Sequence, residues 1–89
     1  MADNKNDWEL FSWVIRGNQR RKVILALEKP TIPSKIKKEA KMSLSNVSKI
    51  LSTFKKRGLV HCLNPGAITG RIYELTEKGQ WVRDKVLEK

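Results

Sequence analysis

The chain has 89 residues, which is enough for one domain with one modest core. Its 19 lysines and arginines against 9 acidic residues give a net charge of +10, which favours a polyanionic partner such as DNA, RNA or an anionic membrane surface. No apolar run is long enough to span a membrane, and no signal-like apolar segment follows the polar N-terminus, so we expect a cytoplasmic protein without membrane contact. The single cysteine excludes an internal disulfide, in agreement with a reducing compartment.

The N-terminal residues 1–7 are polar and we expect them to be flexible, so that a single domain spans residues 8–89. Apolar residues begin at Trp8, and Phe11 falls on the same face of an expected short helix, with Trp13 beside it. This is more apolar surface than a small monomer usually exposes. We therefore expect it to pack on the core or on a partner subunit, with a ligand or partner-protein site as the alternative.

A Gly-Asn pair breaks this pattern, and Asn18 is a candidate N-cap for a second helix over residues 19–28. The first turn of that helix holds a cluster of cations that includes Arg20 and Arg21. Cations at a helix N-terminus oppose the helix dipole. Phosphate contact would explain them, and plain surface charge is the alternative.

Pro33 suits the first position of a third helix, which we expect to end at about Lys41. The apolar face of this helix is thin, and Lys37, Lys38 and Lys41 share the opposite face. A very short strand at residues 31–32 would precede it.

The next helix covers residues 44–57. Ser43 can cap its free N-terminal amides, and Gly58 can adopt the left-handed conformation that ends a helix. Its apolar residues fall within one arc of about 120°, and the opposite face carries no acid. That face consists of Ser45, Lys49, Ser52 and Lys56, with Ser48 and Asn46 at its margins. Short side chains allow close approach to a surface and lysines neutralise phosphate, so this face fits DNA as well as it fits solvent.

A short helix, a tight joint and a longer basic helix follow one another, which is the helix-turn-helix arrangement. Residues 59–63 and 71–75 then form two expected strands of a hairpin with a loop of about seven residues. Thr76 caps a last helix over residues 77–88, with Trp81 close to its inward side. The predicted fold class is α+β, mainly α: a winged helix-turn-helix with a two-stranded β-wing and flanking terminal helices.

Four segments carry a resemblance to a known family. They are Pro33-Ser34-Lys35-Ile36, Leu44-Ser45-Asn46-Val47-Ser48-Lys49-Ile50-Leu51, Lys56-Arg57-Gly58-Leu59-Val60 and Gly70-Arg71-Ile72-Tyr73-Glu74-Leu75-Thr76-Glu77-Lys78-Gly79. The chain resembles the prokaryotic winged-helix transcription regulators of the MarR and ArsR type, most closely the small single-domain versions common in archaea. The resemblance implies a homodimer that binds double-stranded DNA, with the helix over 44–57 in the major groove. The wing over 59–75 would lie on the adjacent backbone or minor groove.

The same resemblance assigns roles to residues. Base edges would be read by Ser45, Asn46, Ser48 and Lys49, and the chemistry agrees because Asn can pair with adenine and Lys can bond to guanine. The expected phosphate contacts are Arg20, Arg21, Lys37, Lys38, Lys41, Ser43, Ser52, Lys56 and Arg71. Arg71, at the base of the wing, would reach the minor groove or its phosphates, with a cross-strand surface charge as the alternative. The expected dimer or partner contacts are Trp8, Phe11, Trp13 and Trp81.

We expect no cofactor or metal. Full-length MarR-type regulators dimerise through long terminal helices that also frame an effector pocket, whereas the terminal helices here are short, which speaks against a small-molecule effector. ArsR-type metal sensors use paired thiolates. Here His61 and Cys62 are adjacent in a strand, so they point to opposite faces and cannot chelate one ion together.

Three other functions are less favoured. A winged helix can dock a protein, here through Trp8, Phe11 and Trp13, but such a module need not be so basic. General nucleic-acid binding also fits the charge, although the basic faces lack aromatic residues for stacking single-stranded RNA bases. An enzyme is not expected, because the chain has one His, one Cys, no facing carboxylate pair and no glycine-rich phosphate loop.

Overall fold

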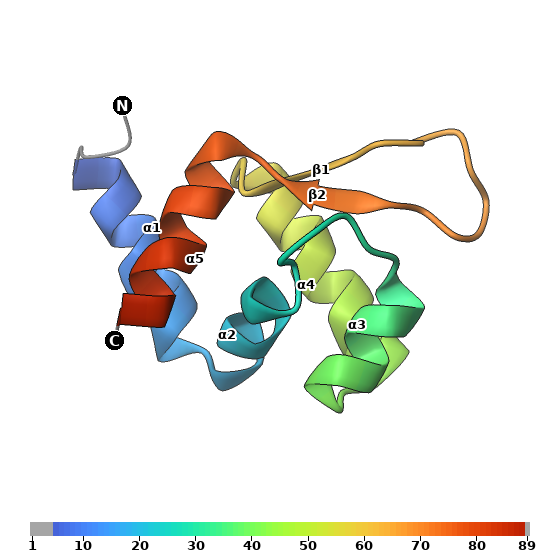
Figure 1. The fold of residues 1–89 in the computed structure, drawn as a ribbon, viewed down its shortest axis with the longest axis horizontal. Helices are drawn as coiled ribbons and strands as arrows, with labels where there is room; N and C mark the ends of the chain where they lie inside the picture. Colours follow the sequence, from blue (N-terminus) through green and yellow to red (C-terminus); the bar gives the residue numbers. More distant parts are fainter. Residues whose placement is uncertain (1–4, 89) are drawn as a thin grey trace.

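The computed structural model describes residues 5–88, which form five helices and one two-stranded antiparallel sheet. The elements are α1 (Lys5–Arg16), α2 (Asn18–Leu25), α3 (Pro33–Ala40), α4 (Leu44–Lys56), β1 (Val60–Cys62), β2 (Tyr73–Leu75) and α5 (Glu77–Glu88). In Figure 1 the terminal helices α1 and α5 lie side by side at one end, and α3, α4 and the wing occupy the other. The predicted fold class, a mainly helical winged helix-turn-helix, is confirmed.

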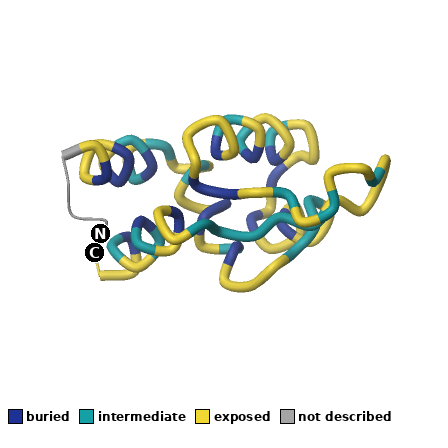
Figure 2. The backbone as a smooth tube through the Cα atoms, turned by 90° about the horizontal axis from the view of Figure 1, so that it is seen from above, coloured by how far each residue is buried: buried dark blue, intermediate teal, exposed yellow. Residues whose placement is uncertain are grey.

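The core is made by the inward faces of all five helices and the start of the wing. Its largest fully buried side chains are Phe54, Ile24, Leu27, Ile36, Leu51 and Leu59. Figure 2 shows the buried stretches along the inner sides of the helices, while the far end of the wing is exposed. Of the apolar residues in the arc predicted for the fourth helix, Val47, Leu51 and Phe54 are buried in this core, Ile50 is half-buried, and Leu44 at the start of the helix is 47% exposed.

The first helix begins earlier than expected. Residues 5–7 are the first residues of α1 and not a flexible tail, and Asp7 is only 2% exposed, with the Lys78 ammonium 3.9 Å from its carboxylate. The rest of the expected tail lies outside the described residues. We attribute the early start of α1 to its packing along α5, which covers the polar residues in the first turn of α1.

The second helix also differs from the prediction at both ends. Gly17 is its N-cap residue and makes no side-chain cap, whereas Asn18 is the first helical residue and accepts a hydrogen bond from Arg21 (3.2 Å). The helix ends at Leu25, three residues early, yet Leu27 beyond it is 1% exposed. Core burial continues past the helix, which is why the apolar pattern overstated its length.

The wing strands pair in the register Val60–Leu75, His61–Glu74 and Cys62–Tyr73. They are shorter than predicted, because the Asn64 side chain accepts the Ile72 amide (2.7 Å) where a further strand bond would form. The short strand expected at residues 31–32 is reduced to one bridge, in which Thr31 and Tyr73 exchange two backbone hydrogen bonds (3.0 and 2.8 Å). This bridge holds the start of α3 against the wing.

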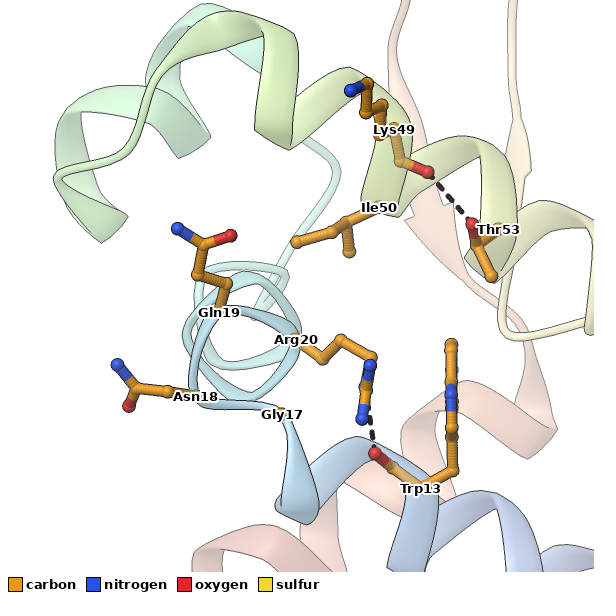
Figure 3. A pocket seen from close by; sticks show the side chains of 8 residues that line it. All are labelled: Trp13, Gly17, Asn18, Gln19, Arg20, Lys49, Ile50 and Thr53. Carbon is orange, nitrogen blue, oxygen red and sulfur yellow. Dashed lines mark hydrogen bonds between the residues drawn. The ribbon is translucent and has the colours of Figure 1, made fainter.

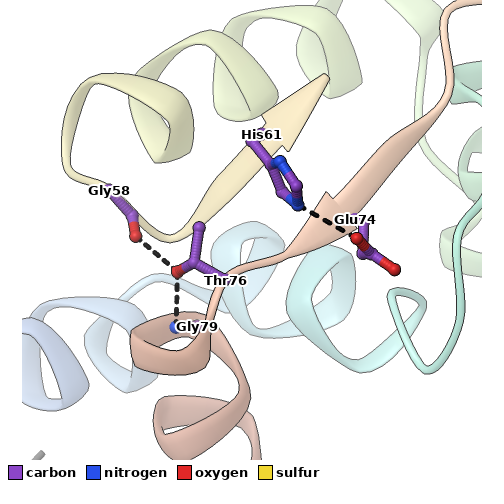
Figure 4. Close-up of polar contacts among 5 residues, drawn as sticks. All are labelled: Gly58, His61, Glu74, Thr76 and Gly79. Atoms are coloured by element: carbon purple, nitrogen blue, oxygen red, sulfur yellow. Dashed lines mark hydrogen bonds and ion pairs between the residues drawn. The ribbon is translucent and has the colours of Figure 1, made fainter. Parts of the chain in front are cut away.

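Both ends of the wing meet at a polar joint. The Thr76 hydroxyl accepts from the Gly79 amide (3.1 Å), which confirms it as the cap of α5, and donates to the Gly58 carbonyl (2.6 Å) (Figure 4). Gly58 has φ +80°, as expected for a residue that ends a helix. A Cβ atom on Gly79 would overlap the Leu59 carbonyl, so a glycine is required there.

We predict that Thr76→Val and Gly79→Ala destabilise the fold. Thr76→Val keeps the shape but removes the cap and leaves the Gly58 carbonyl without this donor, at a cost of about 1–2 kcal/mol. Gly79→Ala forces the backbone apart and should cost about 1–3 kcal/mol. Urea unfolding followed by tryptophan fluorescence measures both, with Thr69→Val on the exposed wing tip as the matched control. Equal stability of Thr76→Val and the control would show that the hydrogen bonds of the Thr76 hydroxyl do not stabilise the fold.

Candidate nucleic-acid interface

The joint between α3 and α4 fixes the helix-turn-helix. Lys41 ends α3 in the left-handed conformation (φ 55°), and the next residue, Met42, is buried and donates its amide to the Lys37 carbonyl (3.2 Å). The Ser43 hydroxyl then accepts the Asn46 amide (3.2 Å), which confirms Ser43 as the N-cap of α4. These local bonds set the angle between the two helices without a long loop.

The outward face of α4 is accessible. All the predicted polar-face residues are exposed except Asn46, which is half-buried; the exposed ones are Ser45, Ser48, Lys49, Ser52 and Lys56. The structure therefore brings the four predicted base readers together on one helix. Their individual contacts with DNA stay predictions.

Further cations lie on α3, which packs against α4. Lys37, Lys38 and Lys41 are exposed, as their predicted role requires. Residues 33–57 hold eight cations and only one acid, Glu39. Most of the net charge of the chain is therefore carried by the helix-turn-helix.

An open groove of ≈ 540 Å³ separates α4 from the wing. Ser48, Ser52 and Lys55 line its helix side, and Thr69 and Arg71 line its wing side. Lys55 was not among the predicted contacts. Its spacing of i, i+4 and i+7 from Ser48 and Ser52 could have revealed it, since such residues form one stripe of a helix.

The wing holds its own arginine. Arg71 donates from Nε to the Ala67 carbonyl (2.8 Å), so part of its guanidinium stabilises the loop. Its predicted contact with the minor groove stays a prediction.

His61 and Cys62, the two adjacent wing residues considered as metal ligands, have different surroundings. His61 is exposed and contacts Glu74 across the strands (3.0 Å), whereas Cys62 is half-buried with its Sγ 3.6 Å from Asn64 Oδ1. Among the residues that the structure describes, no group of three or more His, Cys, Asp or Glu side chains could hold a metal ion.

Arg20 has a structural contact that the sequence did not suggest. Its Nε donates to the Trp13 carbonyl (2.8 Å), and its guanidinium carbon lies 4.6 Å from the centroid of the Trp13 ring. Figure 3 shows both side chains at the edge of a hollow of ≈ 380 Å³ between α1, α2 and α4. Arg57 also stacks on this ring at 4.2 Å, and Phe54 meets it edge-on at 5.8 Å.

The predicted dimer or partner contacts divide into two groups. Phe11 is buried in the core and Trp13 packs on α4, so both have contacts within the chain. Trp8 is 46% exposed and meets Trp81 edge-on at 5.0 Å, with the Lys85 ammonium 5.6 Å from each ring centroid. The aromatic surface left for a partner is therefore the one shared by α1 and α5.

The architecture described above is that of a winged-helix domain. No family model matches the chain, and no curated protein matches it. The structure is similar to a MarR family transcriptional regulator from Silicibacter pomeroyi (TM-score 0.72, 16% identity), covering 94% of this chain and 63% of that one. It is also similar to HlyU from Vibrio cholerae (TM-score 0.73, 16% identity; 99% and 92% covered).

A third similar structure is ZitR from Lactococcus lactis in complex with DNA (TM-score 0.71, 20% identity), covering 80% of this chain and 50% of that one. The chain thus spans less than two thirds of the Silicibacter and Lactococcus proteins. At these identities the likeness establishes the shared fold. Among residues 5–88, no helix is long and apolar enough to cross a membrane.

We predict that the neighbouring arginines 20 and 21 differ in their effect on stability. Arg20→Gln removes the bond to Trp13 and a cation–π contact, and should lower the free energy of unfolding by about 1–2 kcal/mol. Arg21 is exposed and bonds only locally to Asn18, so Arg21→Gln should change stability by less than about 0.5 kcal/mol. Urea unfolding measures both. Equal stability of the two variants would show that Arg20 is a surface cation like Arg21 and that its contacts with Trp13 do not stabilise the fold.

Proposed function

We propose that this protein is a sequence-specific double-stranded DNA-binding transcription regulator of the MarR/ArsR type. One observation carries the proposal: the exposed face of α4 has no acidic residue, and α3, which packs against α4, carries exposed lysines. The small side chains on α4 allow its backbone to approach base edges, and its 13 residues extend about 20 Å, which suits a major groove. Because DNA is the partner, we place the protein in the cytoplasm and assign it no enzymatic activity.

The proposed roles follow from position. Asn46 and Lys49 read base edges with Ser45 and Ser48, since amide and ammonium groups match the major-groove pattern. The lysines of α3 hold phosphates on the flanking backbone. Such contacts position the protein but carry no sequence information.

We further propose a homodimer through the α1/α5 surface. This surface presents Trp8, which is 46% exposed and which a monomer leaves in water. Residues 5–16 hold two cations and two acids, and residues 77–88 hold three of each. Two basic copies can therefore approach through their neutral ends, with their α4 helices on half-sites about one helical turn apart.

The structural neighbours support this proposal by analogy. The Silicibacter pomeroyi protein is a MarR family transcriptional regulator, and ZitR was solved in complex with DNA. The placement among small archaeal, ArsR-like regulators rests on the sequence resemblance and stays a prediction. We propose no effector or cofactor.

Selection from a random duplex pool at two salt concentrations, followed by sequencing of the bound fraction, tests the function. An enriched palindromic motif supports a dimeric sequence-specific regulator. Salt-sensitive binding without enrichment would replace it with general nucleic-acid binding. Absence of binding at both salts would refute DNA recognition and favour a protein-docking module, for which the exposed Trp8 is the candidate contact.

We predict that Asn46 and Lys38 contribute differently to binding. Asn46→Ala should relax the sequence preference at one position, at a cost of roughly 1–3 kcal/mol, because a bidentate base contact is lost. Lys38→Ala, like Lys37→Ala, should weaken binding to all sequences alike and lower the salt slope by about one. Fluorescence anisotropy over a salt series measures both effects.

Arg16→Ala is the matched control, since it removes one exposed cation from the last turn of α1, outside the helix-turn-helix. Its salt slope should equal that of the wild type. A uniform loss of affinity for Asn46→Ala across all sequences would show that Asn46 does not read a base.

A further inference from the structure

The tip of the wing is uncharged and exposes an aliphatic side chain. Residues 64–70 contain no acid or base, and Ile68 among them is 95% exposed, the highest value of any large apolar side chain in the described residues. A single exposed aliphatic residue is not unusual in itself. Two further features of this loop indicate a function for Ile68.

The first feature is that the loop is held in one conformation by its own hydrogen bonds. The Asn64 side chain accepts the Ile72 amide (2.7 Å) and donates to the Gly70 carbonyl (3.2 Å). The Ala67 amide donates to the Asn64 carbonyl (3.0 Å), and Arg71 donates to the Ala67 carbonyl (2.8 Å). Ile68 is therefore presented on a pre-organised loop, which lowers the ordering cost of any contact it makes.

The second feature is position. Ile68 lies on the rim of the groove of ≈ 540 Å³, opposite Ser48, Ser52 and Lys55 of α4. Hydroxyl groups and an ammonium are the groups that bind a sugar-phosphate strand. If α4 occupies the major groove, the strand that borders it runs through this groove. The tip then lies beyond that strand, where the minor groove begins.

We propose that Ile68 is an apolar contact of the wing with the DNA minor groove, packing on deoxyribose and base edges. This inference rests on the proposed function. Apolar side chains do enter minor grooves, where they respond to groove width and to the A·T or G·C content of the site. Unlike a lysine or arginine, an isoleucine releases no counterions, so its contribution to affinity is independent of salt.

The test is a salt series of duplex binding with three variants of Ile68. Ile68→Ala loses most of the packed surface, so its affinity should fall about tenfold, with the salt slope unchanged. Ile68→Lys places a cation at the tip, and the slope should become steeper by about one. Ile68→Leu conserves the apolar volume and should stay within about threefold of the wild type. Because Ile68 is 95% exposed, none of the three substitutions disturbs the core.

A second measurement identifies the groove. In the selected duplex, the base pairs flanking the α4 site are changed from A·T to G·C or to inosine·C, which lacks the minor-groove amino group of G·C. The wild type should lose affinity for G·C and retain it for inosine·C, while Ile68→Ala should distinguish them less.

The outcomes separate the two proposals. If the wild type binds no duplex, the proposed function fails and this inference fails with it. If the wild type binds but Ile68→Ala has equal affinity, or Ile68→Lys leaves the slope unchanged, then only the role of Ile68 is refuted. A discrimination of the flanking pairs that persists in Ile68→Ala would also refute it.

Discussion

The hydroxyl of Thr76 makes the contact on which the geometry of the proposed interface depends. It joins the end of α4, through the Gly58 carbonyl, to the first turn of α5, through the Gly79 amide. The wing leaves this joint at Leu59 and returns to it at Leu75, so the joint sets where the wing lies relative to α4. Because Gly79 has no side chain, α5 can pack directly against the Leu59 carbonyl. A reading helix and a wing can act on one duplex only if their spacing is fixed in this way.

A second contact connects α4 to α1 and α2. Trp13 of α1 packs edge-on against Phe54 of α4 and carries two guanidinium groups on its ring. Such contacts are worth about 0.5–2 kcal/mol each when partly desolvated. They join α1, α2 and α4 to one another. In a dimer through α1 and α5, the separation of the two α4 helices would then be determined by the fold and not by a flexible linker.

Much of this architecture could be predicted because its signals are local. Ser43 and Gly58 bound α4 through capping and a positive φ, and Thr76 starts α5 in the same manner. The predictions failed where contacts between residues far apart in the sequence determine the local structure. The start of α1 at Lys5 depends on the contact with α5, more than sixty residues away in the chain, and the role of Arg20 depends on the Trp13 carbonyl. The strand ends were misplaced because an Asn64 side chain replaces a backbone partner, which no periodicity reveals.

Charge is distributed unevenly between the two halves of the molecule. The terminal helices are neutral overall, while residues 33–57 hold eight cations and one acid. A duplex would therefore be attracted from a distance by α3 and α4, whatever its sequence. The wing tip, residues 64–70, carries no charge, so it adds nothing to that long-range attraction. Any discrimination by the wing tip must therefore come at close contact, through shape, and would add selectivity to the attraction that the basic helices exert on any duplex.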